Sequence, residues 1–176
     1  MEEDIKKVRE YSIKELRAIC QATAPNPARE SKVGLFSRIF SIYFTKILLY
    51  TNVPPPVVMA FSVLVFFVGI GLLALNQFIT NLIGVGVIFL SIVLDGTDGE
   101  LARARKQTSI AAGMYGEPVS HDIQYGFAFL LVAIGLHLGG TSSWIIMLGA
   151  LAGIAKLIYR LLEIRFWDVF HGHQSE

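Results

Sequence analysis

The sequence predicts an all-α fold: a polytopic transmembrane helical bundle with an N-terminal amphipathic helix in the membrane interface. Of the 176 residues, 53% are hydrophobic and 16% are charged, whereas a soluble globular domain has roughly 25% charged residues. No charged residue lies between Lys46 and Asp95 or between Asp122 and Lys156. A helix needs about 20 apolar residues to cross roughly 30 Å of hydrocarbon, so uncharged runs of this length indicate membrane spans.

Residues 1–32 are predicted to form a cytosolic N-terminal helix and a linker. The mixture of charged and apolar residues over positions 3–21 is typical of an exposed amphipathic helix, and Pro25 and Pro27 end it. Cys20 is the one cysteine, so it cannot form a disulfide within the chain, and it is interpreted as a bystander.

The next segment, residues 33–50, is predicted to lie in the membrane interface. Its apolar residues recur at spacings of three and four, as on one face of a helix; they are Phe36, Ile39, Phe40, Tyr43, Phe44, Ile47 and Leu48. Arg38 and Lys46 interrupt the pattern, which favours a helix lying flat with its apolar side toward the membrane. An additional span is the alternative, because both basic side chains could snorkel.

The membrane domain, residues 33–176, is predicted to continue with four spans, at about 56–75, 78–95, 120–139 and 143–162. Three consecutive prolines, ending at Pro56, open the first span, where proline suits the first helical turn. A polar turn joins the first two spans, a charged loop over residues 96–116 joins the middle two, and a glycine turn joins the last two.

The basic residues predict the orientation of this bundle. Nine Lys and Arg residues precede the first span, three lie in the charged loop, three lie near the end of the fourth span, and neither outer turn has any. Because basic residues concentrate in cytoplasmic loops, the N-terminus and the charged loop are predicted to face the cytosol. The chain is expected in the cell (inner) membrane or its equivalent.

Two pairs of glycines in the last two spans predict close helix packing. Gly135 and Gly139 are four residues apart, as are Gly149 and Gly153, and such small-residue spacings let helices approach closely. Packing within the bundle is the favoured interpretation, and a dimer face is the alternative. A homodimer is expected.

Acidic residues gather where the second span ends and the third begins. Asp95 and Asp98 are three residues apart, and Glu117 and His121 are four apart, so each pair shares one face of a helix. A helical hairpin could bring the pairs together, and a divalent cation would relieve their repulsion and desolvation. Hard oxygen ligands without paired thiolates favour Mg²⁺ or Mn²⁺ over zinc.

The residues that follow Asp98 suggest a ligand for this cluster. Gly99 and Ala102 leave the helix surface bare, so a bulky ligand could approach the backbone. Arg103 lies one turn further on and could bind a phosphate with two guanidinium N–H groups. Any one of these acids alone would be interpreted as a solvated helix end, but the combination favours a site.

The segment resembles the CDP-alcohol phosphotransferases (CDP-alcohol phosphatidyltransferases), whose motif is D-x-x-D-G-x-x-A-R followed by G-x-x-x-D-x-x-x-D. The first half matches in full at Asp95, Asp98, Gly99, Ala102 and Arg103. In the second half Gly113 matches the glycine, Glu117 stands in place of the third aspartate, His121 stands in place of the fourth, and Asp122 comes one position later.

This resemblance implies transfer of a phospho-alcohol (phosphatidyl-type) group from a CDP-alcohol to a hydroxyl acceptor, with release of CMP, in phospholipid biosynthesis. It implies two Mg²⁺ or Mn²⁺ ions held by Asp95, Asp98 and Glu117. The implied nucleotide-binding residues are Gly99, Ala102, Arg103 and Gly113. His121, or alternatively Asp122, would accept the proton of the incoming hydroxyl.

The expected partners are therefore the CDP-alcohol donor, the acceptor and membrane lipid. No basic run with interleaved aromatic residues is present, so no nucleic acid is expected. Lys156, Arg160 and Arg165 could bind a phosphate on the acceptor; their alternative role is anchoring at the cytosolic face.

Two other functions compete with the transferase. A catalytically inactive or regulatory homologue that binds CDP-alcohol and metal is favoured by the altered second half of the motif and by four spans where the family has six. Two helices would then be missing, or a partner subunit would close the cavity. An ion transporter is disfavoured, because its acids should lie in the middle of a span.

Overall fold

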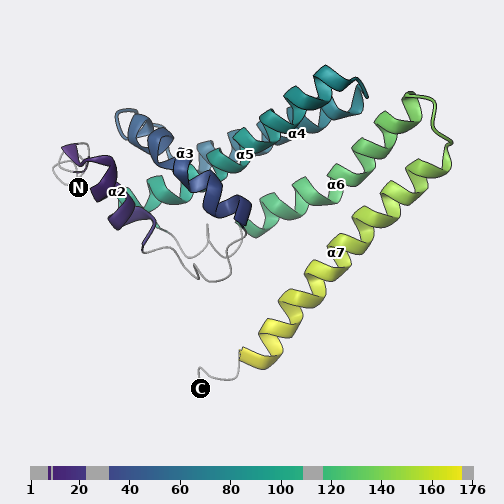
Figure 1. The fold of residues 1–176 in the computed structure, drawn as a ribbon. Helices are drawn as coiled ribbons and strands as arrows, with labels where there is room; N and C mark the ends of the chain where they lie inside the picture. The colour runs from purple at the N-terminus through teal and green to yellow at the C-terminus, as the bar shows by residue number, and fades with distance from the viewer. Residues whose placement is uncertain (1–7, 9, 23–31, 109–116, 172–176) are drawn as a thin grey trace. The chain divides into compact units, whose positions relative to one another are not determined.

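The computed structural model describes residues 8, 10–22, 32–108 and 117–171, and its regular secondary structure over these residues is entirely helical (Figure 1). The helices are α2 (Ile13–Cys20), α3 (Lys32–Leu48), α4 (Pro55–Ala74), α5 (Phe78–Ala104), α6 (Glu117–Leu138) and α7 (Trp144–His171). The all-α prediction is confirmed.

Four of these helices, α4 to α7, are long and apolar enough to cross a membrane. α3 is not among them: its 17 residues span about 26 Å at 1.5 Å per residue, which is less than the roughly 30 Å of a bilayer core. The polytopic helical architecture is therefore confirmed.

The chain divides into two compact units. The first contains Met1–Phe66 and Gly86–Glu117, and the second contains Phe67–Val85 and Pro118–Glu176. The division passes through α4 and α5, so each unit has one half of that helix pair.

The core of the first unit lies where α2 and α3 pack against the C-terminal part of α5. Leu16 of α2, Ile42 of α3 and Leu101 of α5 are all fully buried there, and burial of each such side chain is worth roughly 1.5–3 kcal/mol. Cys20 is fully buried in the same cluster. The N-terminal helix predicted as exposed is therefore docked on one side, and Cys20 is part of a core.

α3 buries its polar side and exposes its apolar side. Ser37, Ser41 and Thr45 succeed one another at intervals of one turn, and all three are buried. The exposed side consists of Val33, Leu35, Phe36, Ile39, Phe40, Tyr43, Phe44 and Ile47. In water this arrangement would be the reverse of the usual one, so it agrees with the predicted contact between α3 and lipid.

α5 continues past Asp95 to Ala104, so the loop predicted for residues 96–116 begins later than expected. The extension is helical because Leu101 and Ala104 are buried in the core of the first unit. The helix ends just before Lys106, which adopts a left-handed φ of 54°, a conformation typical of helix C-terminal caps.

Two other helix ends differ from the prediction. Tyr11 and Ser12 are not helical, so the helix predicted over residues 3–21 is interrupted and α2 begins at Ile13. Ser12 and Glu15 form a capping box there, with Glu15 N–H donating to Ser12 Oγ and Ser12 N–H donating to Glu15 Oε2. α7 continues to His171, beyond the predicted end near residue 162.

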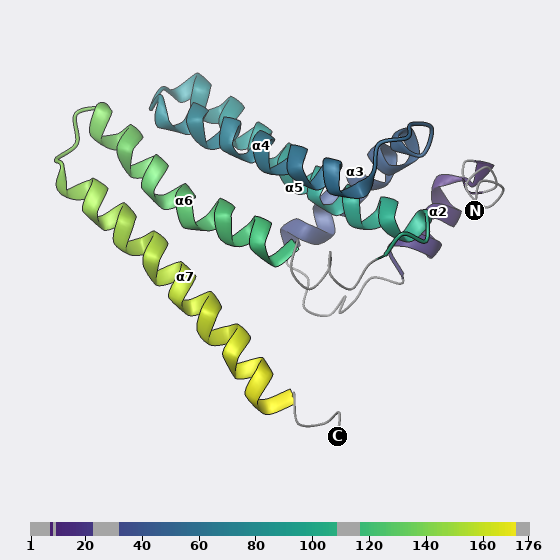
Figure 2. The same ribbon diagram turned by 180° about the vertical axis from the view of Figure 1, so that it is seen from behind.

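In the second unit α6 and α7 form an antiparallel hairpin, seen from both sides in Figures 1 and 2. Gly153 approaches the α6 backbone so closely that a Cβ added there would lie 2.5 Å from Gly126 O. Gly149 would meet Ala133 of α6 in the same way. These glycines therefore pack helices within the chain, as predicted from their spacing.

Candidate active site

The first half of the predicted site lies on the last turns of α5, in the first unit. Asp95 and Asp98 are both half-buried, whereas Thr97 and Glu100 are buried, with exposed fractions of 0% and 1%. This stretch of helix therefore has an accessible side that carries two carboxylates and a buried side that carries other polar groups.

The chemistry of the accessible side suits a divalent cation. Asp95 and Asp98 offer hard oxygen donors from one helix face, which is the ligand type that Mg²⁺ and Mn²⁺ prefer. Within the part of the chain that the structure describes, no three His, Cys, Asp or Glu side chains are grouped as a metal site. Glu117 is the first residue of α6, and its side chain lies outside the described set, so its role as a third ligand stays a prediction.

Arg103 lies against the backbone of the motif. Its Nε donates to Cys20 O of α2 at 2.6 Å, and its Nη1 would lie 3.3 Å from a Cβ added at Gly99. The surface that Gly99 leaves bare is therefore occupied by the guanidinium group, and the glycine permits that position. Ala102 lies one residue earlier on α5 and is half-buried.

Glu100 is a residue of the motif that the sequence analysis did not single out. Its Oε1 accepts hydrogen bonds from Gln21 Nε2 at 2.8 Å and Ser41 Oγ at 2.7 Å, and its Oε2 accepts one from Thr45 Oγ1 at 2.7 Å. The signal that could have identified this contact is the polar stripe on α3, which includes Ser41 and Thr45 on the side of the helix opposite its apolar face.

Arg105 is a second residue that the sequence analysis passed over. It is 7% exposed, and its guanidinium group donates to three carbonyl oxygens at and beyond the end of α3: Leu48 at 2.9 Å, Thr51 at 2.7 Å and Val53 at 2.5 Å. Arg105 therefore connects the end of α5 to the end of α3 and to the segment that leads into α4.

The second half of the predicted site lies mostly in the second unit. His121 and Asp122 are half-buried on α6, and Asp122 Oδ1 lies 3.5 Å from Arg160 Nε of α7. The ammonium group of Lys156 lies over the ring of Tyr125, 5.5 Å from its centroid. Two of the predicted acceptor-binding cations therefore have partners within the α6–α7 hairpin. Gly113 and the side chain of Arg165 lie outside the described set.

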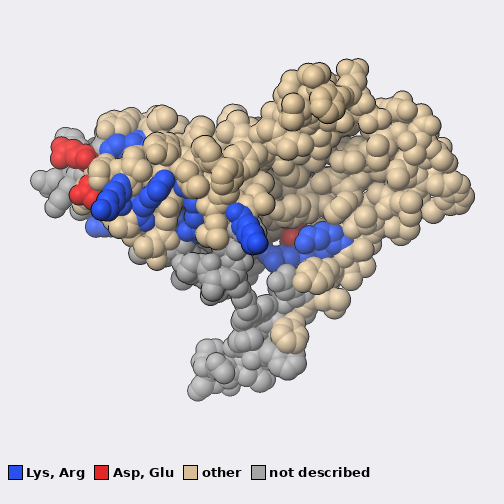
Figure 3. Space-filling model, in the orientation of Figure 1, with Lys and Arg blue, Asp and Glu red and all other residues tan. Residues whose placement is uncertain are grey.

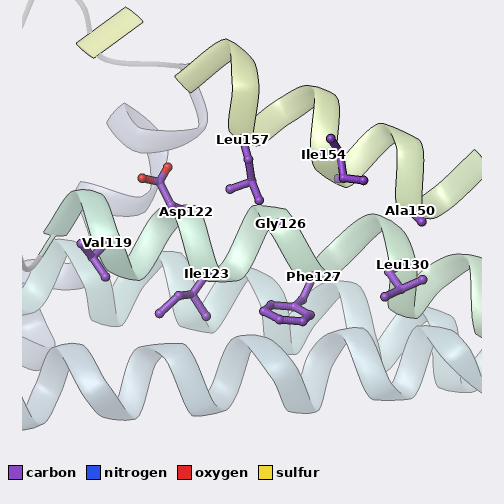
Figure 4. Close-up of a pocket in the computed structure, with 10 residues that line it drawn as sticks. Val119, Asp122, Ile123, Gly126, Phe127, Leu130, Ala150, Ile154 and Leu157 are labelled. Atoms are coloured by element: carbon purple, nitrogen blue, oxygen red, sulfur yellow. The ribbon is translucent and has the colours of Figure 1, made fainter. Parts of the chain in front are cut away.

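A pocket of about 420 Å³ lies between α6 and α7 (Figure 4). Its lining is apolar except for Asp122; the lining residues are Val119, Asp122, Ile123, Gly126, Phe127, Leu130, Ala150, Gly153, Ile154 and Leu157. The pocket thus combines a hydrocarbon-like wall with one carboxylate.

The turns of the two hairpins contain no charged residue. On the face shown in Figure 3, the ends of the α4–α5 and α6–α7 hairpins carry no blue or red atom. This agrees with the absence of basic residues from both predicted outer turns.

The two halves of the predicted site belong mostly to different units. Asp95 and Asp98 are in the first unit, whereas His121 and Asp122 are in the second. The prediction that these side chains act on one bound ion and substrate therefore stays a prediction.

A sequence model of the family described as CDP-alcohol phosphatidyltransferase matches residues 37–169. The matched region begins within α3, ends within α7 and includes both halves of the motif. No curated protein matches the chain.

Proposed function

The chain belongs to the CDP-alcohol phosphatidyltransferase family, and on that premise we propose that it transfers a phospho-alcohol group from a CDP-alcohol to a hydroxyl acceptor in phospholipid biosynthesis. The acceptor oxygen attacks the β-phosphorus, a phosphodiester bond forms, and the bond to CMP breaks. The four apolar helices fit an integral membrane protein. The observation that carries the proposal is the complete first half of the motif, with Asp95 and Asp98 on the accessible side of α5.

We propose that Asp95 and Asp98, with Glu117, hold Mg²⁺ or Mn²⁺, two ions in all. Bound metal would neutralise the diphosphate and stabilise the departing CMP phosphate. Arg103 is proposed to bind a phosphate of the donor, and Gly99, Ala102 and Gly113 to admit its nucleotide. The position of Arg103 supports the phosphate contact, because its guanidinium group lies beside Gly99 of the motif; a nucleotide that contacts Gly99 would displace this group.

His121 is the proposed base that accepts the proton of the incoming hydroxyl, since imidazole can do so near neutral pH. Asp122 is the alternative base. Asp122 Oδ1 lies 3.5 Å from Arg160 Nε, so this carboxylate already has a partner within the hairpin.

We propose that at least one substrate is a lipid. The pocket between α6 and α7 is lined by apolar side chains of two helices that are apolar enough to cross a membrane, so a hydrocarbon chain could enter it from the bilayer. Lys156 and Arg160 are proposed, more weakly, to meet a phosphate of the acceptor. A lipid-linked CDP-alcohol is expected to support CMP release, and a water-soluble CDP-alcohol to support less.

The test is CMP release by the purified chain in lipid nanodiscs with Mn²⁺, a CDP-alcohol and candidate acceptors. Asp98→Asn keeps the size of the side chain and removes its charge, so we expect the rate to fall by about 100-fold or more. Glu10→Gln, a change at an exposed acid of the N-terminal segment, is the control and should keep the wild-type rate. Full activity of the Asp98 variant would overturn the proposal.

The second candidate is an inactive or regulatory homologue that binds a CDP-alcohol without turning it over. The replacement of two motif aspartates by Glu117 and His121 favours it. Metal-dependent binding of the CDP-alcohol without CMP release, with every acceptor tried, would identify this function. Restoring Asp at both positions should then introduce turnover.

A further inference from the structure

The buried carboxylate of Glu100 is a feature of the motif that the proposed chemistry does not use. It is 1% exposed, and its three hydrogen bonds come from side chains outside α5: Gln21, Ser41 and Thr45. A buried charge is costly unless it is hydrogen-bonded, and here both carboxylate oxygens accept. Glu100 therefore joins α5 to α3 and to the residue that follows α2.

Glu100 does not share the side of α5 on which the metal ligands are predicted. It follows Asp98 by two residues, which corresponds to a rotation of about 200° around the helix. Asp98 is half-buried whereas Glu100 is buried. Glu100 and Asp98 therefore point to opposite sides of the same turn, so one can hold the turn while the other binds.

A hydrophobic residue would fill this position at less desolvation cost. Buried charges often contribute no more to stability than apolar residues of similar size. The carboxylate adds a fixed orientation of α5, which apolar packing alone does not provide. Three hydrogen bonds from three different residues fix the rotation of α5 about its own axis, and that rotation sets where Asp95 and Asp98 point.

The end of α2 contacts the motif a second time. Arg103 Nε donates to Cys20 O, and the neighbouring Gln21 side chain donates both to Glu100 and to Arg38 O at 2.8 Å. Two adjacent residues at the end of α2 thus hold two residues of the motif, which are one turn apart on α5. The match to the family begins only at residue 37, so this contact lies partly outside it.

We infer that Glu100 is a positioning residue: through Ser41, Thr45 and Gln21 it holds the turn of α5 that carries Asp95, Asp98 and Arg103 in the orientation that binds metal and donor. This inference rests on the proposed function of that turn. Misplacing reacting groups by about 1 Å can cost on the order of 100-fold in rate, so loss of the Glu100 hydrogen bonds should affect metal use and turnover.

The experiment compares Ser41→Ala/Thr45→Ala with Ser37→Ala in the full chain in nanodiscs. Ser37 is a matched control, because it is also buried on α3 but donates to Gly34 O of its own helix. We expect the double variant to raise the half-saturating Mn²⁺ concentration about 10- to 100-fold, the range for loss of groups that orient metal ligands. The half-saturating Mn²⁺ concentration of Ser37→Ala should equal that of wild type. Direct titration with Mn²⁺, without donor, should show the same shift.

Glu100→Gln keeps the size of the side chain and part of its hydrogen bonding. Its half-saturating Mn²⁺ concentration should therefore lie between those of wild type and Glu100→Leu. Far-UV circular dichroism measures the folded helical content of every sample, so the Mn²⁺ values are compared at equal folding. An unchanged Mn²⁺ requirement in the double variant, or an equal change in Ser37→Ala, would overturn the inference.

The same measurements separate this inference from the proposed function. If wild type binds Mn²⁺ but never releases CMP, the transferase proposal fails, and weakened Mn²⁺ binding by the double variant still supports positioning by Glu100. If wild type releases CMP and the double variant equals the control, the inference alone fails. If wild type neither binds Mn²⁺ nor releases CMP, both fail.

Discussion

Single residues of α5 have distinct tasks within one helical turn. Asp98 is accessible, Gly99 leaves room for the guanidinium group of Arg103, and Glu100 is buried in hydrogen bonds to other helices. The sequence analysis singled out the first two because acids and a glycine at these offsets match the family motif. Glu100 could not be separated from a solvated charge by sequence, because only its neighbours in space distinguish the two.

Cys20 provides a residue-scale prediction about pH. Burial raises the pKa of its thiol to about 11, with a further increase from the Glu100 charge and a smaller opposing effect of Arg103. The thiolate is the reactive form, so alkylation of the folded chain should keep accelerating up to pH 11. The alkylation rate of the unfolded chain should level off near pH 9. Because the folded state holds this proton more tightly, stability should decrease as pH rises between about 9 and 11.

Iodoacetamide labelling followed by mass spectrometry, over a pH series, measures this directly. Cys20 is the one cysteine of the chain, so the labelled fraction needs no assignment. Glu100→Gln should shift the profile to lower pH, because it removes a charge that disfavours the thiolate. A folded chain labelled as fast as the unfolded one at pH 8 would contradict the buried position of Cys20.

Whole elements are held by polar contacts as well as by apolar packing. α2 has 8 residues, which is too short for a stable isolated helix. Its Ser12 cap, its buried Leu16 and the contacts of Cys20 and Gln21 with α5 compensate for this. The N-terminal helix is thus a support for the motif.

Ser12→Ala should weaken α2 by about 1 kcal/mol, because it removes the side chain that accepts from Glu15 N–H. We expect faster hydrogen exchange over Ile13–Cys20 and faster alkylation of Cys20. Lys14→Ala, on the exposed side of the same helix, is the control. Equal exchange in both variants would show that the capping box does not limit the opening of α2.

Gly153→Ala tests the packing of α6 against α7. The added Cβ would lie 2.5 Å from Gly126 O, so the helices must separate, which costs about 1–3 kcal/mol. In a chain of this size that lowers Tm by about 2–4 °C per kcal/mol. Gly71→Ala, where a Cβ meets no atom within 4 Å, should leave Tm unchanged or raise it. Equal Tm values for the two variants would contradict this close approach.

At the scale of the whole molecule, the uncharged turns of both hairpins predict the orientation in the membrane. Neither the turn at Gln77 nor the turn at Thr141 is near a Lys or Arg residue, whereas Lys106 lies just beyond the end of α5, close in sequence to Arg103 and Arg105. Basic residues are retained on the cytosolic side. The proposed active site would therefore face the cytosol. The expected homodimer stays a prediction.

Substituted cysteines in a Cys20→Ser background test this orientation in whole cells. A membrane-impermeant maleimide should label Gln77→Cys and Thr141→Cys from outside, and Lys106→Cys only after permeabilisation. All three positions are exposed, so access to the reagent depends on the side of the membrane. Labelling of Gln77→Cys and Lys106→Cys from the same side would overturn the four-span orientation.

The sequence alone determined the membrane-spanning architecture and the family, and it predicted that Asp95 and Asp98 share one face of a helix. Uncharged runs, the acid pair Asp95 and Asp98 and the glycine spacings are local patterns, and their physical meaning depends little on distant neighbours. The end of α5 was predicted too early for the same reason. Residues 96–104 have the composition of a polar loop, and only the core that buries Leu101 shows that they are helical.

Only the tertiary structure decided which polar residues support the motif. Glu100, Ser41 and Gln21 are far apart in sequence and meet because α2 and α3 pack against α5. The polar stripe that includes Ser41 and Thr45 is visible in the sequence, but no sequence pattern shows which residue it contacts. Only the packing of α3 against α5 shows that this residue is Glu100. The accessible carboxylates were therefore predictable, and the buried one that orients their turn was not.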